Sequence, residues 1–296
     1  MENVKLSLEP KIVGKKIIQS KVFEENLSEK GLVRLLRKQD PTQLIERSLN
    51  STITNIERRA KYIKASLITK DNVKYYVLVH LGMAGAWLAN KNLDNIPEKF
   101  RKHIHVEFLL EDDTKLVFSD IRRMGGITVY SEEEFSNLSS INNLGPEPFW
   151  EDAASTFLKN IRKKKWNEPS SKVDPLKRCI KVAIMDQGVV AGIGNIYACE
   201  ALHRVGIDPT TPVWKLSDEK LLQIFESARD LMAYSITVGG SSISDYVDGN
   251  GMMGSFQNYL HVYAQRNCGT CNTEIVRIDL GRTTHFCPNC QKTIVE

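Results

Sequence analysis

Four cysteines near the C-terminal end of the chain have the spacing of metal ligands. Cys268-x-x-Cys271 is followed, after fifteen residues, by Cys287-x-x-Cys290. Each pair can sit on a tight turn that aims two thiolates at one point, and four thiolates form a closed tetrahedral zinc site. Two disulfides, the alternative, would conflict with a reducing cytosol. We therefore expect one structural Zn²⁺ per chain, with no coordination position left open for catalysis.

The stretch between the two cysteine pairs has the pattern of a β-hairpin. Residues 275–279 and 284–286 read as short strands, and Leu280-Gly281-Arg282 joins them. The sequence therefore predicts a zinc-held hairpin that carries an arginine near its tip.

A second segment has the residue types of a phosphate-binding turn. Gly192 and Gly194 stand just before a helical pattern, and Asn195 adds a side-chain donor. Free backbone N–H groups at such a turn suit a phosphate oxygen. Taken alone, Gly-x-Gly before a helix is a weak signal and is often just a tight connection. Nine basic residues against two acidic ones between Lys159 and Lys181 favour a DNA phosphate, although a solvated helix end remains the alternative.

The composition sets wide limits on the kind of protein. The 296 residues are 42% hydrophobic and 26% charged, as in ordinary globular proteins, and the net charge of +4 decides little. No run of 18 apolar residues is present, so we expect no membrane span. The first residues lack an apolar signal core, which favours the cytosol or the nucleoid.

Two kinds of secondary structure must position these residues. After an initial helical pattern that ends at Gly14, six strand-like runs follow, at 51–57, 62–68, 74–81, 104–110, 115–119 and 127–130. Several of them alternate apolar and polar residues, which predicts an antiparallel β-sandwich. Helical patterns follow from residue 151 onward, including 196–205 and a helix capped by Ser217. We expect an α+β multidomain chain: a β-sandwich with flanking helices at 1–131, a linker at 132–150, a helical domain with a flexible loop at 151–261, and the zinc finger at 262–296.

The chain resembles the formamidopyrimidine-DNA glycosylase/endonuclease VIII family over almost its whole length. The segment from Asp186 to Pro209, with Gly192-Ile193-Gly194-Asn195-Ile196-Tyr197 at its centre, is similar to the family's helix-two-turn-helix nearly residue for residue. Further matches are Arg58-Arg59-Ala60-Lys61-Tyr62, His80-Leu81-Gly82-Met83-Ala84-Gly85, Asp120-Ile121-Arg122-Arg123-Met124-Gly125, Gly145-Pro146-Glu147-Pro148, Gly239-Gly240-Ser241-Ser242 and the cysteine pairs.

The resemblance implies catalytic and phosphate-binding roles for four residues. Lys61 would assist catalysis and strand cleavage from beside the abasic sugar. Arg282 would grip the phosphates that flank the lesion and assist the second elimination. Asn195 and Lys177 would hold the same phosphates.

The resemblance also implies a set of residues that contact the bases. His103 and Arg122 would contact DNA, and Met83, Arg122 and Met124 would fill the gap left by the flipped-out base. Met124 stands where the family usually has an aromatic wedge. Without the family, Met83 and Met124 fit core packing, whereas Lys61 and His103 fit a solvated surface.

The largest departure from the family concerns the N-terminal catalytic pair. The family begins Pro-Glu-Leu-Pro-Glu once the initiator methionine is removed; the proline amine attacks the sugar C1′ atom, and the adjacent glutamate transfers a proton. Met1-Glu2-Asn3-Val4 aligns just after that pentapeptide. As written, the chain has neither group. We expect that the native reading frame extends upstream through Met-Pro-Glu-Leu-Pro-Glu.

Together these features predict a bifunctional DNA glycosylase and abasic-site lyase of base-excision repair. Its partner would be double-stranded DNA that contains a damaged base or an abasic site, and the protein would act as a monomer in the cytoplasm at the nucleoid. The alternative is a non-catalytic protein of the same fold that binds damaged or abasic DNA. The residues do not distinguish an oxidised purine from an oxidised pyrimidine.

Overall fold

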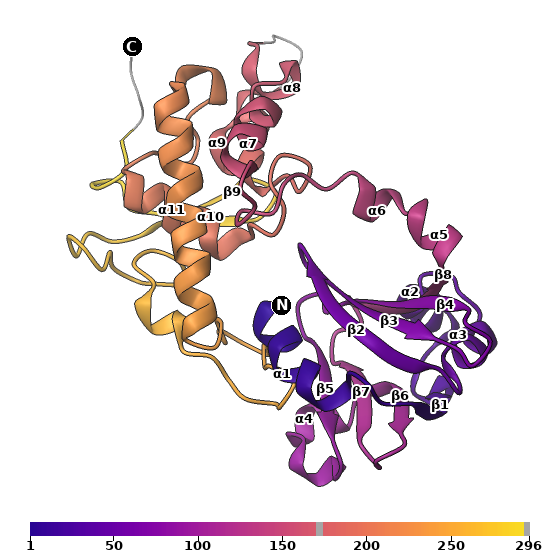
Figure 1. Cartoon of the computed structure of the whole chain (residues 1–296). Coiled ribbons are helices and arrows are strands. Elements are labelled where there is room, and N and C mark those ends of the chain that lie inside the picture. The colour runs from indigo at the N-terminus through magenta and orange to yellow at the C-terminus, as the bar shows by residue number, and fades with distance from the viewer. Residues whose placement is uncertain (170–173, 293–296) are drawn as a thin grey trace. The chain divides into compact units, whose positions relative to one another are not determined.

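The computed structural model describes residues 1–169 and 174–292 (Figure 1). Lys172, a member of the basic segment, lies outside these residues. The chain divides into two compact units. Unit 1 comprises Met1–Asn142 and Val238–Gln257, and unit 2 comprises Asn143–Thr237 and Asn258–Glu296.

Unit 1 is built on two antiparallel sheets of four strands each. The first sheet has the order β1 (Ile17–Val22), β6 (Ile104–Leu110), β7 (Lys115–Asp120), β5 (Gly85–Asn90), and the second β2 (Thr52–Arg59), β3 (Tyr62–Ile68), β4 (Lys74–His80), β8 (Gly126–Ser131). Strand β3 alternates between half-buried and buried residues, so that Ile63, Ala65 and Leu67 enter a core that also holds Trp87 and Phe118 of the other sheet. The predicted β-sandwich is confirmed.

Short helices flank the sandwich. In α1 (Glu2–Ile12), Val4, Leu8 and Ile12 lie at intervals of four residues and are fully buried against the sandwich core. The chain turns at Gly14, whose φ of +84° is in the left-handed region. The other helices of the unit are α2 (Glu29–Leu35), α3 (Pro41–Ser48), α4 (Glu98–Arg101), α5 (Glu132–Ser136) and α6 (Ser139–Asn142), with 3₁₀ turns η1 (Glu24–Asn26) and η2 (Leu93–Asn95).

The segment Val238–Gln257 packs with unit 1, whereas we expected it to be a loop of the helical domain. The Gly249 N–H donates to Ser7 Oγ at 2.7 Å, and the Ala89 N–H donates to the Gly249 carbonyl at 3.0 Å. Only glycine fits here, because a Cβ on Gly249 would lie 2.6 Å from Leu8 Cγ. This segment thus contacts both α1 and β5.

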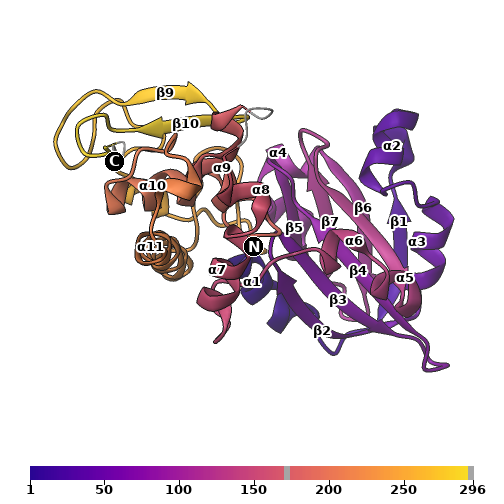
Figure 2. The ribbon, with the colours of Figure 1, turned by 90° about the horizontal axis from the view of Figure 1, so that it is seen from above.

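Unit 2 is helical and ends in the cysteine-rich hairpin. Its elements are α7 (Ala153–Ile161), α8 (Lys164–Asn167), η3 (Pro175–Arg178), α9 (Ile180–Met185), α10 (Asn195–Val205), η4 (Val213–Lys215), α11 (Asp218–Thr237), β9 (Val276–Asp279) and β10 (Thr283–Phe286), while η5 (Phe256–Tyr259) spans the junction of the units. Phe157 of α7 stacks on Phe225 of α11 in the core. Figure 2 shows the β9–β10 hairpin alongside α10. The predicted helical domain and hairpin are confirmed.

None of the helices in the described ranges is both long and apolar enough to cross a membrane.

Candidate DNA-binding residues and zinc centre

The four predicted ligands converge in unit 2. The Sγ atoms of Cys268, Cys271, Cys287 and Cys290 all lie within 4.8 Å of one another, and none is in a disulfide. Backbone N–H groups point at two of them, from Thr270 to Cys268 and from Cys290 to Cys287, each at 3.4 Å. Four thiolates at one point, supported by such donors, fit a tetrahedral zinc ion. Four protein ligands would leave no open position, so the ion would be structural and would hold the hairpin together.

Purified protein is expected to contain one zinc per chain, measured by elemental analysis. Cys268→Ala should lower that content because it removes one of the four converging thiolates. Cys179→Ala is the matched control, since Cys179 is a buried free thiol at the start of α9 that does not belong to the cluster. Zinc-free protein that keeps its hairpin would contradict the assignment.

Asn195 is the first residue of α10, and its side chain joins that helix to the hairpin. Asn195 Nδ2 donates to the Thr283 carbonyl at 2.8 Å, and Lys181 Nζ donates to Asn195 Oδ1 at 2.5 Å. Lys181 is only 1% exposed. Burial lowers the pKa of Lys181, and the nearby Arg282 charge lowers it further. Lys181, Asn195 and Arg282 therefore form one cationic cluster, with Arg282 exposed at the tip of the hairpin.

The glycine turn before α10 is held by a single side chain. Gln187 Nε2 donates to the carbonyls of Met185 and Ile193 at 2.9 and 3.0 Å, and Gln187 Oε1 accepts from the Gly192 N–H at 2.9 Å. Gly192 has a φ of +88°, which disfavours other residues. The turn before the N-terminus of α10 is thus fixed in one conformation.

Lys177 stands apart from this cluster in the described structure. It lies in η3 with its side chain exposed, and it has no hydrogen bond or ion pair to Lys181, Asn195 or Arg282 in the part of the chain that is described.

In unit 1, Lys61 lies at a hairpin tip next to a histidine. Ala60, with a φ of +52°, and Lys61 form the two-residue turn between β2 and β3. Tyr62 pairs with His80 across the sheet, and their rings are 5.1 Å apart. Burial lowers the pKa of His80, and the charges of Arg37 and Lys61 lower it further. Since His80 Nδ1 accepts the Gly82 N–H at 3.2 Å, a neutral His80 carries its proton on Nε2, where it can donate to a ligand.

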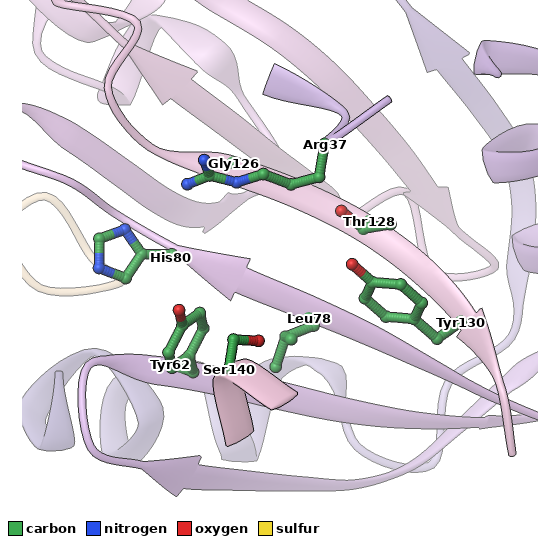
Figure 3. Close-up of a pocket in the computed structure, with 8 residues that line it drawn as sticks. All are labelled: Arg37, Tyr62, Leu78, His80, Gly126, Thr128, Tyr130 and Ser140. Atoms are coloured by element: carbon green, nitrogen blue, oxygen red, sulfur yellow. The ribbon is translucent and has the colours of Figure 1, made fainter. Parts of the chain in front are cut away.

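A cavity of about 330 Å³ lies on the outer face of the second sheet beside these residues (Figure 3). Its polar lining carries donors and no carboxylate: Arg37, Tyr62, His80, Thr128, Tyr130 and Ser140. A donor-rich wall of this kind suits an anionic group. His80 was predicted only as part of a motif, and neither His80 nor Arg37 was predicted to be a site residue.

Two neighbouring loops carry the predicted void-filling residues: the first is 81–84, between β4 and β5, and the second is 121–125, between β7 and β8. Gly82, with a φ of +61°, lies so close to the second loop that an added Cβ would be 2.7 Å from Gly125 N. Met83 and Met124, on these two loops, are 52% and 42% exposed, which contradicts core packing as their role. Large apolar side chains that face solvent in adjacent loops are available to a ligand.

Asp120 fixes the second loop. Its buried carboxylate accepts the N–H groups of Arg122 at 3.1 Å and of Gly125 at 2.6 Å. The half-buried His103 lies next to Asp120, since the His103 carbonyl accepts the Asp120 N–H at 3.2 Å. Arg122 is exposed on the same loop.

Comparison with known proteins gives a consistent result along the chain. A model described as the formamidopyrimidine-DNA glycosylase N-terminal domain matches residues 1–127, and one described as the formamidopyrimidine-DNA glycosylase H2TH domain matches residues 144–247. Formamidopyrimidine-DNA glycosylase of Listeria monocytogenes is 33% identical over 99% of this chain and 98% of its own length. That of Rickettsia conorii is 35% identical over 98% of this chain and 97% of its own.

Solved structures agree with the sequence matches. The complex of Lactococcus lactis Fpg with abasic-site DNA has a TM-score of 0.79 at 29% identity, covering 99% of this chain and 98% of that one. The complex of the same protein with Fapy-dG containing DNA gives a TM-score of 0.79 at 29% identity, with the same coverage. Sequence, fold and the four-cysteine cluster together show that this chain belongs to the formamidopyrimidine-DNA glycosylase family.

Proposed function

We propose that this protein is a DNA glycosylase of base-excision repair with abasic-site lyase activity, acting as a monomer on double-stranded DNA. Family membership, with relatives that match from end to end, is the observation that carries the proposal. A DNA substrate implies that the protein works where the chromosome is, which in a bacterial cell is the nucleoid in the cytoplasm.

In unit 2, the Lys181–Asn195–Arg282 cluster supports a role in binding the DNA backbone. The amide at a helix N-terminus and the exposed guanidinium are two donors suited to phosphate oxygens, and the buried Lys181 ammonium holds that amide in place. Zinc contributes by fixing the hairpin that carries Arg282. Lys177, exposed on η3, would add a phosphate contact outside this cluster.

Unit 1 supports a role in opening the base stack. The exposed Met83 and Met124 are apolar side chains that could enter the space left by an extruded base, and the exposed Arg122, on the loop of Met124, would enter it with them. His103, whose carbonyl accepts the Asp120 N–H, would contact DNA beside that loop. Lys61 at the β2–β3 tip and His80 at the end of β4 would face the abasic sugar and its phosphates. Arg282, besides gripping phosphate, would assist the second elimination.

Phosphate anchoring predicts a loss of affinity that does not depend on the lesion. Asn195→Ala and Arg282→Ala should each weaken binding to damaged and undamaged duplexes alike, because phosphate contacts carry little sequence information. Loss of the Arg282 ion pair should also lower the slope of log affinity against log salt by roughly one unit. Arg277→Ala is the control, an exposed arginine on β9 of the same hairpin. Unchanged binding in both test variants would place the DNA on another surface.

Turnover separates the proposed enzyme from a non-catalytic protein that only binds damaged DNA. Duplexes that carry an oxidised purine, an oxidised pyrimidine, a preformed abasic site or no lesion should be compared for base release and strand cleavage. An enzyme releases the base from at least one oxidised duplex and nicks the abasic one. Tight binding to the abasic duplex without base release or nicking would support the non-catalytic alternative.

A further inference from the structure

One buried imidazole contacts the zinc cluster from outside the four cysteines. His203 Nε2 lies 3.3 Å from Cys268 Sγ, and His203 is only 9% exposed. His203 comes from α10, whereas Cys268 belongs to the finger, so this contact joins two parts of unit 2 that are far apart in the sequence.

The chemistry of the thiolate fixes the direction of this contact. A thiolate that binds zinc has no hydrogen, so it can only accept, and His203 Nε2 must carry the proton and donate. Cys268 also accepts the Thr270 N–H at 3.4 Å. Cys287, which is equally buried, is approached by the Cys290 N–H and, within the described residues, by no imidazole.

The surroundings hold the His203 ring in place. The ring lies against the ring of His261, with centroids 5.6 Å apart, and His261 Nδ1 contacts Thr270 Oγ1 at 3.1 Å. The buried carboxylate of Glu200, one turn before His203 on α10, accepts the backbone N–H groups of the His261 segment at 2.8–2.9 Å. An imidazole fixed in this way can orient a metal ligand.

We propose that His203 is a positioning residue of the zinc centre, which donates from Nε2 to the Cys268 thiolate. The bond keeps this one ligand aimed at the ion and lowers its reactivity toward electrophiles. It also fastens the finger to α10 at a second point, since Asn195 at the other end of the helix donates to Thr283 of the hairpin. His203 therefore helps to hold the hairpin that carries Arg282.

The first test is zinc retention by the whole chain, without DNA, in competition with a chelator at one fixed pH. His203→Phe keeps an aromatic ring but loses the donor, and should retain zinc about 10- to 100-fold more weakly. His203→Gln places an N–H near the position of Nε2 and should restore most of the loss. His261→Phe is the control, because phenylalanine keeps a ring against His203, and His261 touches no cysteine Sγ atom among the described contacts.

The second test distinguishes positioning from a general loosening of the finger. In zinc-loaded protein, the rate of alkylation by iodoacetamide at Cys268 is compared with the rate at Cys287, using mass spectrometry. His203→Phe should raise the ratio of the two rates, because Cys268 loses one of its two donors whereas Cys287 loses none; a loosened fold would raise both rates together.

Two results would overturn the proposal: zinc retention by His203→Phe equal to that of the His261→Phe control, or His203→Gln behaving like the phenylalanine variant. If the phenylalanine variant does not fold, His203→Met takes its place, because an unbranched thioether fills the same space with little strain and has no donor.

Discussion

A polypeptide that begins Pro-Glu-Leu-Pro-Glu and continues into Met1 is expected to release an oxidised base faster than one that begins at Met1, by roughly 10²- to 10⁴-fold. The reason is chemical. A terminal proline offers a secondary amine that can attack C1′ and form an iminium ion, and it is partly neutral near pH 7, unlike a lysine. Between Met1 and Glu296 every proline nitrogen is part of a peptide bond, so no residue of this stretch supplies such a group.

The groups present at Met1 do not replace this pair. In a polypeptide that begins there, burial and the charge of Arg58 lower the pKa of the Met1 α-amine to about 6. The amine is therefore largely neutral near pH 7, but it is buried. The Glu2 carboxylate, the nearest acid, is bound to Arg58 Nε at 2.5 Å. The amine is shielded from solvent and the carboxylate is paired with Arg58, so neither is available in the way that a terminal proline amine and a free neighbouring acid would be.

The controls for this prediction separate chemistry from binding. An extension with alanine in place of its first proline keeps the length but removes the secondary amine, and should recover little of the rate. Both extended forms should bind an abasic duplex about as tightly as the polypeptide that begins at Met1. Equal rates of base release with and without the extension would refute the prediction and indicate a different nucleophile.

Lys61→Met is expected to slow base release and strand cleavage by the extended polypeptide by about 10²- to 10⁴-fold, a range typical of losing one positioned proton-transfer group. Lys61 lies at the β2–β3 tip, close enough to His80 for its charge to lower the pKa of that imidazole. A cation there can assist reaction at the abasic sugar. Single-turnover rates on saturating lesion duplex measure the effect without interference from weaker binding.

Lys64→Met is the matched control for Lys61. Lys64 lies on β3, pairs with Glu57 at 2.6 Å and contacts the rings of Tyr76 and Phe135, so its charge is already engaged in the sheet. Its loss should leave the rate within a few-fold of the parent. A Lys61 variant that weakens lesion binding but keeps the single-turnover rate would make Lys61 a DNA-binding residue and not a catalytic one.

Much of the fold could be predicted from local patterns, and the strands that were missed show the limit. Runs such as β3 and β6 alternate strongly enough that their bounds were predicted to the residue. Strand β5 was missed because glycine and alanine give it little strand propensity; its residues are buried by partners distant in sequence, including Gly249. Strand β1 was missed because it contains a bulge between Ile17 and Gln19 that breaks the alternation.

Some parts of the candidate site could likewise be predicted from the sequence, whereas others depend on the tertiary fold. Spacing alone predicted the four-cysteine cluster, because two Cys-x-x-Cys pairs have few other uses. The motif that carries His80 was recognised, but its place beside Lys61 depends on the pairing of β3 with β4, which sequence spacing does not show. Lys181 was counted only as part of a basic segment. Its burial against Asn195 and its closeness to the hairpin tip depend on how α9, α10 and the finger pack.

Covalent trapping with borohydride is the most direct test that this protein is a glycosylase that works through an amine. The extended polypeptide, mixed with a duplex that carries an oxidised base, should give one stable protein–DNA complex, joined through the N-terminal residue, and none with the undamaged duplex. If neither polypeptide is trapped or cleaves the DNA while both bind the lesion duplex tightly, the protein is a non-catalytic binder of damaged DNA.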